Sequence, residues 1–309
     1  MMAELELLKK LSEARGISGR EDEIRPLADK IEITPLGNII ALKKGKERAP
    51  KKLMISAHMD EAGLMVTHIT DEGLLNFVPV GEIDRRVLPG KSVTVGENVR
   101  GVIGLKPIHL LKKDEMSKSI PLSELYIDIG AASREEAEKA VKPGDEVTFD
   151  SVFDASGKAI KGRALGGRAG CAILIGMMRH GLKYDAVFAF TVQEETGLCG
   201  SETAAYGVHP AAAIVVDATA AADVPGVSRE RQACRLGEGP VVPFMDKRTI
   251  YDRAYYDMAF RAAEKAGVKC QAKQDIAGGN DAGAIHISRE GVRTAAVSLP
   301  CRYLHSAVG

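Results

Sequence analysis

The sequence predicts an α/β fold in which a mixed, largely parallel sheet has helices on both faces and carries an inserted small β-barrel domain. Helical and strand patterns alternate before residue 65 and again after residue 155, which is typical of an α/β layer. Between them lie short β-rich runs separated by Gly and Pro turns, the pattern of a small barrel. We therefore expect an α/β domain formed by residues 1–65 and 155–309, and an inserted β-rich domain formed by residues 66–154.

The first part of the chain predicts two helices followed by strands. Three leucines among the first eleven residues recur at helical spacing, and the S-G-R-E run at residues 18–21 is a capping box that opens a second helix over residues 20–30. The apolar run L-M-I-S-A at residues 53–57 follows a basic loop and predicts a buried strand. This strand leads directly to His58, so it places a histidine at its carboxyl end.

The remaining elements follow from the spacing of apolar residues that is typical of helices and of strands. In the insert, short runs rich in β-branched and aromatic residues predict strands at residues 74–80, 92–95, 102–105, 126–129 and 146–149. After it, we expect helices over residues 168–180, 251–266 and 282–289, and strands over residues 186–191, 213–216 and 295–299. Ligands of open α/β sheets gather at the carboxyl ends of the strands. Residues that directly follow these strands are therefore the candidates for chemistry.

Composition excludes several classes of protein. The 309 residues carry 42 Lys and Arg against 42 Asp and Glu, so the net charge at pH 7 is zero and a basic nucleic-acid binder is not expected. No apolar run approaches the ~20 residues of a membrane span, and the first ten residues are amphipathic rather than a signal peptide. The five cysteines are odd in number and form no C-x-x-C pair, so we expect small core residues in a cytoplasmic protein, with no thiol catalysis.

Imidazole and carboxylate groups follow four of the predicted strands. These residues are His58 and Asp60, Glu194 and Glu195, Asp217, and His305. Nitrogen and oxygen ligands of this kind suit zinc, cobalt or manganese, and two adjacent glutamates allow one to bind the metal while the other acts as a general base. His58 and Asp60 are two residues apart, so in an extended backbone Asp60 faces the same side and can orient the imidazole.

Each of these pairs by itself is common in proteins without a metal. A lone histidine is often a satisfied core residue, and adjacent acids often cap a helix. Their joint occurrence at strand ends is what favours a metal site. The other histidines lack such neighbours, so we expect them to be structural or exposed: His68, His109, His180, His209 and His286.

Five strings together resemble the cocatalytic metallo-aminopeptidases, the tetrahedral-type family that includes glutamyl and deblocking aminopeptidases and in which several relatives carry endoglucanase names. They are S-A-H-M-D-E-A-G (56–63), V-Q-E-E-T-G-L-C-G-S (192–201), V-D-A-T-A-A-A-D-V-P-G (216–226), G-G-N-D-A-G-A-I-H (278–286) and R-Y-L-H-S (302–306). The resemblance runs over nearly the whole chain and includes the insert. It implies metal-dependent release of N-terminal residues from peptides, with zinc or cobalt as the metal.

The resemblance also implies roles for the strand-end residues. It implies that His58 and Asp217 bind one metal ion, and that Glu195 and His305 bind the other. By the same resemblance Glu194 is the general base and Asp60 orients the metal-binding histidine. Members of the family form dimers through the insert and, in many cases, hollow tetrahedral dodecamers, so a homo-oligomer is expected here.

The chain departs from the family pattern at one place. The family has an Asp-Asp pair whose first member bridges both metal ions, whereas this chain has Gly166-Gly167, within the run G-R-A-L-G-G-R-A-G. Each ion would then keep two protein ligands, fewer than the roughly three of catalytic zinc sites. Two divalent ions about 4 Å apart would also face only the carboxylates of Asp217 and Glu195. We therefore expect one ion, or two weakly bound ions, per chain.

Three functions stay open at this point. The first is an aminopeptidase with an incomplete metal site. The second is a catalytically silent homologue that binds peptides or serves as a structural subunit, which the two glycines favour. The third is a glycoside hydrolase that uses Glu194 and Asp60 as acid and nucleophile, although it leaves the histidines without a role.

Overall fold

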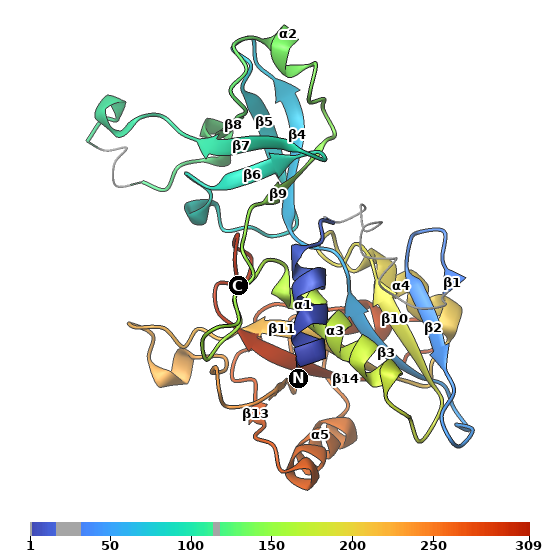
Figure 1. Ribbon diagram of the computed structural model, residues 1–309. Coiled ribbons are helices and arrows are strands. Elements are labelled where there is room, and N and C mark those ends of the chain that lie inside the picture. Colours follow the sequence, from blue (N-terminus) through green and yellow to red (C-terminus); the bar gives the residue numbers. More distant parts are fainter. Residues whose placement is uncertain (1, 17–31, 114–117) are drawn as a thin grey trace. The chain divides into compact units, whose positions relative to one another are not determined.

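The computed structural model describes residues 2–16, 32–113 and 118–309 (Figure 1). The helix and capping box expected within residues 18–30 lie outside these ranges. The chain forms two compact units. Unit 1 contains Met1–Glu61, Phe153–Leu304 and Gly309, and unit 2 contains Ala62–Val152 and His305–Val308.

The core of unit 1 is a mixed sheet with the strand order β1-β2-β10-β3-β11-β14-β12-β13. Its four central strands, β10, β3, β11 and β14, are parallel, whereas β1, β2 and β12 pair with neighbours in antiparallel fashion. This arrangement confirms the predicted fold class. The strands are β1 (Glu32–Ile33), β2 (Ile39–Lys43), β3 (Leu53–His58), β10 (Ala186–Thr191), β11 (Ala212–Ala220), β12 (Val241–Val242), β13 (Gln271–Ala272) and β14 (Arg293–Cys301).

Helices cover both faces of this sheet (Figure 1). Successive residues of a strand point to opposite faces, so Met54 and Ile55 of β3 enter two different hydrophobic cores. On one face lie α1 (Met2–Glu13) and α3 (Leu165–Arg179); on the other lie α4 (Cys199–Val208) and α6 (Ala282–Ile285), while α5 (Arg253–Ala266) packs on β14. A short 3-10 helix, η5, spans Arg229–Arg231.

Most of the helices expected in unit 1 are present, with two differences. The helix expected over residues 282–289 ends at Ile285, and Arg289 has a φ of 53° that a helix cannot contain. Helix α4 was not predicted, because its sequence C-G-S-E-T-A-A-Y-G-V contains glycines and hydroxyl residues of low helix propensity. Packing of α4 against β10 and α6 supplies the stability that its local sequence lacks.

Unit 2 is a closed antiparallel barrel with the strand order β4-β5-β8-β7-β6-β9, as predicted. Its interior is filled by apolar side chains such as Leu64, Leu75 and Ile127, all fully buried. The strands are β4 (Gly63–Ile69), β5 (Leu75–Val80), β6 (Ser92–Val95), β7 (Val99–Gly104), β8 (Tyr126–Asp128) and β9 (Glu146–Phe149). The helices are α2 (Arg134–Ala137), η2 (Arg85–Val87), η3 (Ile108–Leu110) and η4 (Leu122–Glu124).

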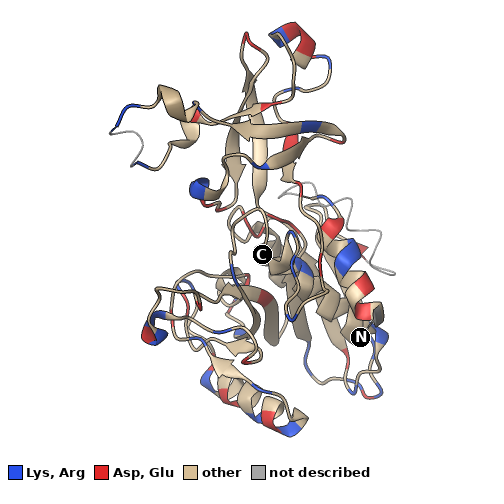
Figure 2. Cartoon of the chain, turned by 60° about the vertical axis from the view of Figure 1, so that its left-hand side comes forward, with Lys and Arg blue, Asp and Glu red and all other residues tan. Residues whose placement is uncertain are grey.

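Positive and negative side chains are interspersed on the helices of unit 1, as Figure 2 shows for α1 and α5. This mixing agrees with the zero net charge of the whole chain. In the described ranges, every helix is too short or too polar to cross a lipid bilayer.

Candidate functional site

The parallel arrangement of the central strands brings two predicted site residues together. Thr191 of β10 pairs with His58 of β3, and β11 runs beside β3 from Ala212 opposite Leu53. This pairing extends to Val215 opposite Ser56, and Asp217 and His58 each follow two residues later on their strands. The two side chains meet, with 3.4 Å between His58 Nε2 and Asp217 Oδ1. Because β11 continues to Ala220, Asp217 lies within the strand and not after it as the sequence predicted.

Asp60 connects the exits of strands β3 and β10. Its carboxylate is 1% exposed and lies 3.4 Å from His58 Nδ1, measured from Oδ1. The same carboxylate accepts hydrogen bonds from the backbone N–H groups of Glu194 (3.2 Å) and Glu195 (3.1 Å). The loop that carries the two glutamates turns through Gln193, which has a φ of 55°. Asp60 thus positions the glutamate pair as well as the imidazole, a role that sequence reasoning did not assign.

The charges of the cluster shift the titration of its members. Burial raises the pKa of Glu194 well above its usual value, and the nearby carboxylates of Asp217 and Glu195 add to the shift. Burial alone would lower the pKa of His58, but Glu194, Asp217 and Asp60 together raise it well above its usual value. A group of carboxylates around one imidazole therefore favours a positive charge at this place, whether a proton or a metal cation supplies it.

The arrangement of His58 and Asp217 fits two ligands of one metal ion. Donor atoms of a tetrahedral zinc site with bonds of ~2.0–2.1 Å lie about 3.3–3.4 Å apart, which matches the 3.4 Å between Nε2 and Oδ1. A fuller ligand set is not assembled: residues 2–16, 32–113 and 118–309 contain no group of three or more His, Cys, Asp or Glu arranged to hold a metal ion. His305 belongs to unit 2, where its Nδ1 lies 3.0 Å from the carbonyl oxygen of Glu82.

The two glycines at the start of α3 have different surroundings. A Cβ added at Gly167 would lie 2.5 Å from Nε2 and 2.6 Å from Cδ2 of His58, closer than real Cβ contacts allow. Among the residues that the structure describes, a Cβ added at Gly166 would meet only the Leu304 side chain within 4 Å, at 3.7 Å. Neither glycine has a positive φ. The helix therefore contacts the imidazole directly at Gly167 and leaves open space at Gly166.

A buried ion cluster fixes the segment that follows β3, and sequence reasoning missed it. Arg168 of α3 is fully buried and donates to the carbonyl oxygens of Met59 (3.2 Å) and Leu11 (3.0 Å) and to Glu61 Oε1 (3.2 Å). Arg163 Nε lies 2.9 Å from Glu61 Oε2. Helix α1 ends against these two arginines, whose positive charges suit the carboxyl end of a helix. In the sequence, the two arginines of the run R-A-L-G-G-R (163–168) are the feature from which this ion cluster could have been predicted.

The buried cysteine that contacts the His58 segment is poorly suited to act as a nucleophile. Cys171 of α3 donates from Sγ to the carbonyl oxygen of His58, at 3.1 Å. Burial raises the pKa of this thiol to about 12. A thiolate would therefore be scarce at neutral pH, which agrees with the expectation that thiol chemistry plays no part.

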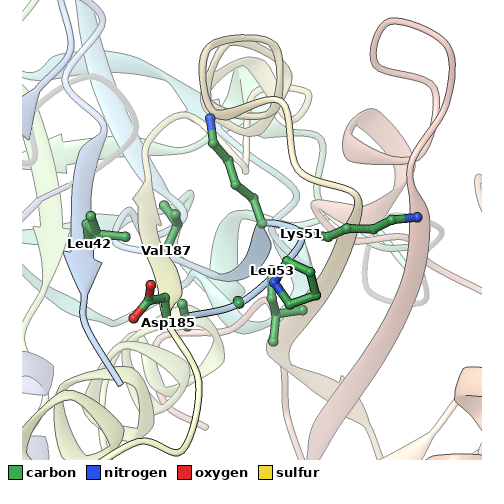
Figure 3. Close-up of a pocket in the computed structure, with 9 residues that line it drawn as sticks. Leu42, Lys51, Leu53, Asp185 and Val187 are labelled. Atoms are coloured by element: carbon green, nitrogen blue, oxygen red, sulfur yellow. The ribbon is translucent and has the colours of Figure 1, made fainter. Parts of the chain in front are cut away.

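The other cavities of unit 1 offer less chemistry than this cluster. A cavity of 160 Å³ lies at the amino ends of β3 and β10, between Lys51, Leu53 and Asp185, at the opposite end of the strands from His58 (Figure 3). Two larger cavities, of 410 and 550 Å³, are lined almost entirely by apolar side chains. The cluster around His58 is therefore the candidate active site.

The sequence is similar to known proteins over most of its length. The family model of the M42 glutamyl aminopeptidases matches residues 37–309. A lysyl aminopeptidase of Pyrococcus furiosus is 35% identical over 327 aligned residues, which cover 99% of this chain and 92% of the relative.

Two solved structures have the same fold over nearly all of the chain. An aminopeptidase of the archaeon Desulfurococcus kamchatkensis has a TM-score of 0.92 and 36% identity, and the match covers 99% of this chain and 89% of that one. The TET1 peptidase of Pyrococcus horikoshii has a TM-score of 0.85 and 37% identity, with 99% and 93% covered. Because the family model matches far more than half of the sequence, this chain belongs to the M42 glutamyl aminopeptidase family.

Proposed function

We propose that the protein is a metal-dependent aminopeptidase that releases N-terminal residues from peptides. The observation that carries this proposal is the 3.4 Å separation of His58 Nε2 and Asp217 Oδ1 beside the half-buried Glu194. In this proposal His58 and Asp217 hold a divalent ion, zinc or cobalt, and Glu195 is a ligand of a second, weaker position; the role of His305 as a metal ligand stays a prediction from the sequence. The names of the relatives support peptides as the substrate class.

In this proposal each side chain of the cluster has a separate role in hydrolysis. A divalent cation held at His58 and Asp217 would act as a Lewis acid toward the scissile carbonyl. Glu194, whose pKa burial raises well above its usual value, accepts a proton from the attacking water and donates it to the leaving amine. The carboxylate of Asp60 accepts a hydrogen bond from the backbone N–H of Glu194 and so keeps Glu194 in place. The same carboxylate holds the His58 ring.

The test separates proton transfer from metal binding. Glu194→Gln should lower the hydrolysis of aminoacyl-nitroanilides by about 100-fold or more, since general acid–base catalysis contributes ~10²–10⁴, while zinc affinity by calorimetry changes little. Glu195→Gln, the adjacent matched control, should instead lower the number of zinc ions bound per chain. Equal turnover of Glu194→Gln and wild type would show that Glu194 is not the base.

A catalytically silent, peptide-binding homologue is the second candidate. It is favoured by Gly166-Gly167, which stand where the family pattern has an Asp-Asp pair. The discriminating measurement is hydrolysis by wild-type protein saturated with zinc or with cobalt. Peptide binding without turnover under both conditions would favour the silent homologue over the enzyme.

We also propose that the chain assembles into a homo-oligomer through the inserted domain, residues 66–154. The TET1 peptidase of Pyrococcus horikoshii, which has the same fold, can assemble into a tetrahedron or a large octahedral shell. In unit 2 of this chain, Ile108 and Leu110 are 70% and 57% exposed, an apolar surface that an interface would cover. Light scattering should find at least a dimer, and Ile108→Lys should weaken it. A wild-type monomer at micromolar concentration would contradict assembly.

A further inference from the structure

A buried aspartate lies beneath the candidate site, and none of the roles above uses it. Asp281, in the run G-G-N-D-A-G-A-I-H, directly precedes α6 and is 1% exposed. Its Oδ2 accepts hydrogen bonds from Thr191 Oγ1 (2.5 Å) and Ser56 Oγ (3.4 Å). Its Oδ1 has no hydrogen-bond partner in the part of the chain that the structure describes.

The two partners of Asp281 lie on the strands that carry the candidate site. Thr191 is the last residue of β10 and pairs with His58 of β3. Ser56 lies two residues before His58, so both point to the same face of β3. Both hydroxyl residues are fully buried. Asp281 therefore joins the carboxyl ends of β3 and β10 at the level from which the His58 and Glu194 segments leave the sheet.

A buried carboxylate costs more free energy than a neutral group that could accept hydrogen bonds from the same two hydroxyl groups. Burying an ionised carboxyl group without a partner of opposite charge costs several kcal/mol, and an asparagine would accept the same hydrogen bonds at lower cost. The compensating positive charge lies above it, because Asp281 interacts electrostatically with His58, and its charge also acts on Glu194. The negative charge of Asp281 therefore favours the binding of a cation at the cluster.

We propose that Asp281 is a positioning residue: it locks Thr191 and Ser56, fixes the exits of β3 and β10, and supplies a buried negative charge that favours a cation between His58 and Asp217. The proposal deepens the proposed function and rests on it for the identity of the cation. The hydrogen-bonding part of the role stands on the metal-free protein alone.

The first experiment measures zinc binding by calorimetry on metal-free protein. Asp281→Asn should bind zinc about 10- to 100-fold more weakly than wild type, the usual loss when an outer partner of a metal site is removed. Thr191→Val, which keeps the shape of the side chain but lacks the hydroxyl, should also weaken binding. Thr191→Ser retains the hydroxyl and is the matched control, so its affinity should stay close to that of wild type.

The second experiment uses no metal. The ring ¹⁵N shifts of His58 should change in Asp281→Asn, which removes the charge of the acceptor, and in Thr191→Val, which removes the donor hydroxyl, but not in Thr191→Ser, which keeps both. The double variant should show less than the sum of the two single effects, since both act through one hydrogen bond. If Asp281→Asn does not fold, the two Thr191 variants decide the question.

The outcomes of the two experiments separate the two hypotheses. A folded Asp281→Asn with wild-type zinc affinity and unchanged His58 shifts would overturn the positioning role, as would equal behaviour of Thr191→Ser and Thr191→Val. Wild-type protein that binds neither zinc nor cobalt would instead refute the metal-dependent function. In that case the His58 shifts still decide whether Asp281 positions the strand ends.

Discussion

Placing an aspartate at Gly166 or at Gly167 should have opposite effects, although the two glycines look equivalent in the sequence. An added side chain at Gly166 finds open space beside Leu304, whereas one at Gly167 meets the His58 ring at 2.5–2.6 Å. Neither position requires a glycine-only backbone conformation. The difference between the variants therefore comes from packing against His58.

The expected magnitudes follow from these contacts. At Gly167, overpacking against a buried ring costs about 1–3 kcal/mol, which corresponds to a Tm lower by about 2–12 °C for a domain of this size. At Gly166, an acidic residue in the first turn of a helix gains about 0.3–1 kcal/mol, and repulsion from Asp217 and Glu194 opposes this gain. The metal-free Tm of Gly166→Asp should therefore stay within about 2–4 °C of wild type.

Zinc should distinguish the variants further. Gly166→Asp restores the carboxylate that the family pattern has at this position, so its zinc affinity should rise by about 10-fold or more, and tenfold tighter binding adds about 1.4 kcal/mol of stability at saturating zinc. Gly167→Asp should bind zinc more weakly than wild type because His58 is displaced. Combining the two substitutions, as restoration of the family's Asp-Asp pair from sequence alone would suggest, should lose part of the gain.

The assay is thermal unfolding with and without zinc, together with calorimetric titration. Gly166→Asn has a similar size without the charge and serves as the control for the helix start. The reasoning would be refuted by a Gly167→Asp protein as stable as Gly166→Asp, or by a folded Gly166→Asp with unchanged zinc affinity and turnover.

Three further predictions follow from the contacts of the site. His58→Ala should lower zinc affinity more than Asp60→Ala, which should lose about 10- to 100-fold; equal titrations for both variants and wild type would exclude a metal site here. Arg168→Met leaves Glu61 buried with one partner fewer and should cost about 3–5 kcal/mol of unfolding free energy in urea, with Arg168→Lys intermediate; a loss below about 1 kcal/mol would contradict this. The pKa of Asp281 is raised to about 6 by burial, above the ~3.9 of an unfolded chain, so the native state binds this proton more tightly. The unfolding free energy of metal-free wild type should therefore fall relative to Asp281→Asn as the pH rises from about 4 to about 6, and parallel pH curves would contradict the shift.

The fold class could be predicted from the local spacing of apolar residues in the sequence. The spacing of apolar residues, every second residue in strands and every three to four in helices, shows which side of each element is buried. Because each buried side must pack against a neighbouring layer, only a few fold architectures are compatible with this pattern. The positions of His58 and Glu194 at the carboxyl ends of parallel strands could be predicted for the same reason, whereas Asp217 lies inside β11, which continues to Ala220. Helix α4 was not, because packing rather than propensity stabilises it.

The contacts that shape the site were decided only by the tertiary structure. Asp60 meets the backbone of Glu194, Arg168 meets the carbonyl of Leu11, and Asp281 meets Thr191, in each case across at least 90 residues of sequence. Local periodicity specifies a buried face, but it does not specify which distant atoms meet on that face. The contrast between Gly166 and Gly167 has the same origin: adjacent residues of one helix face different directions, and only the packed structure places His58 against the second of them.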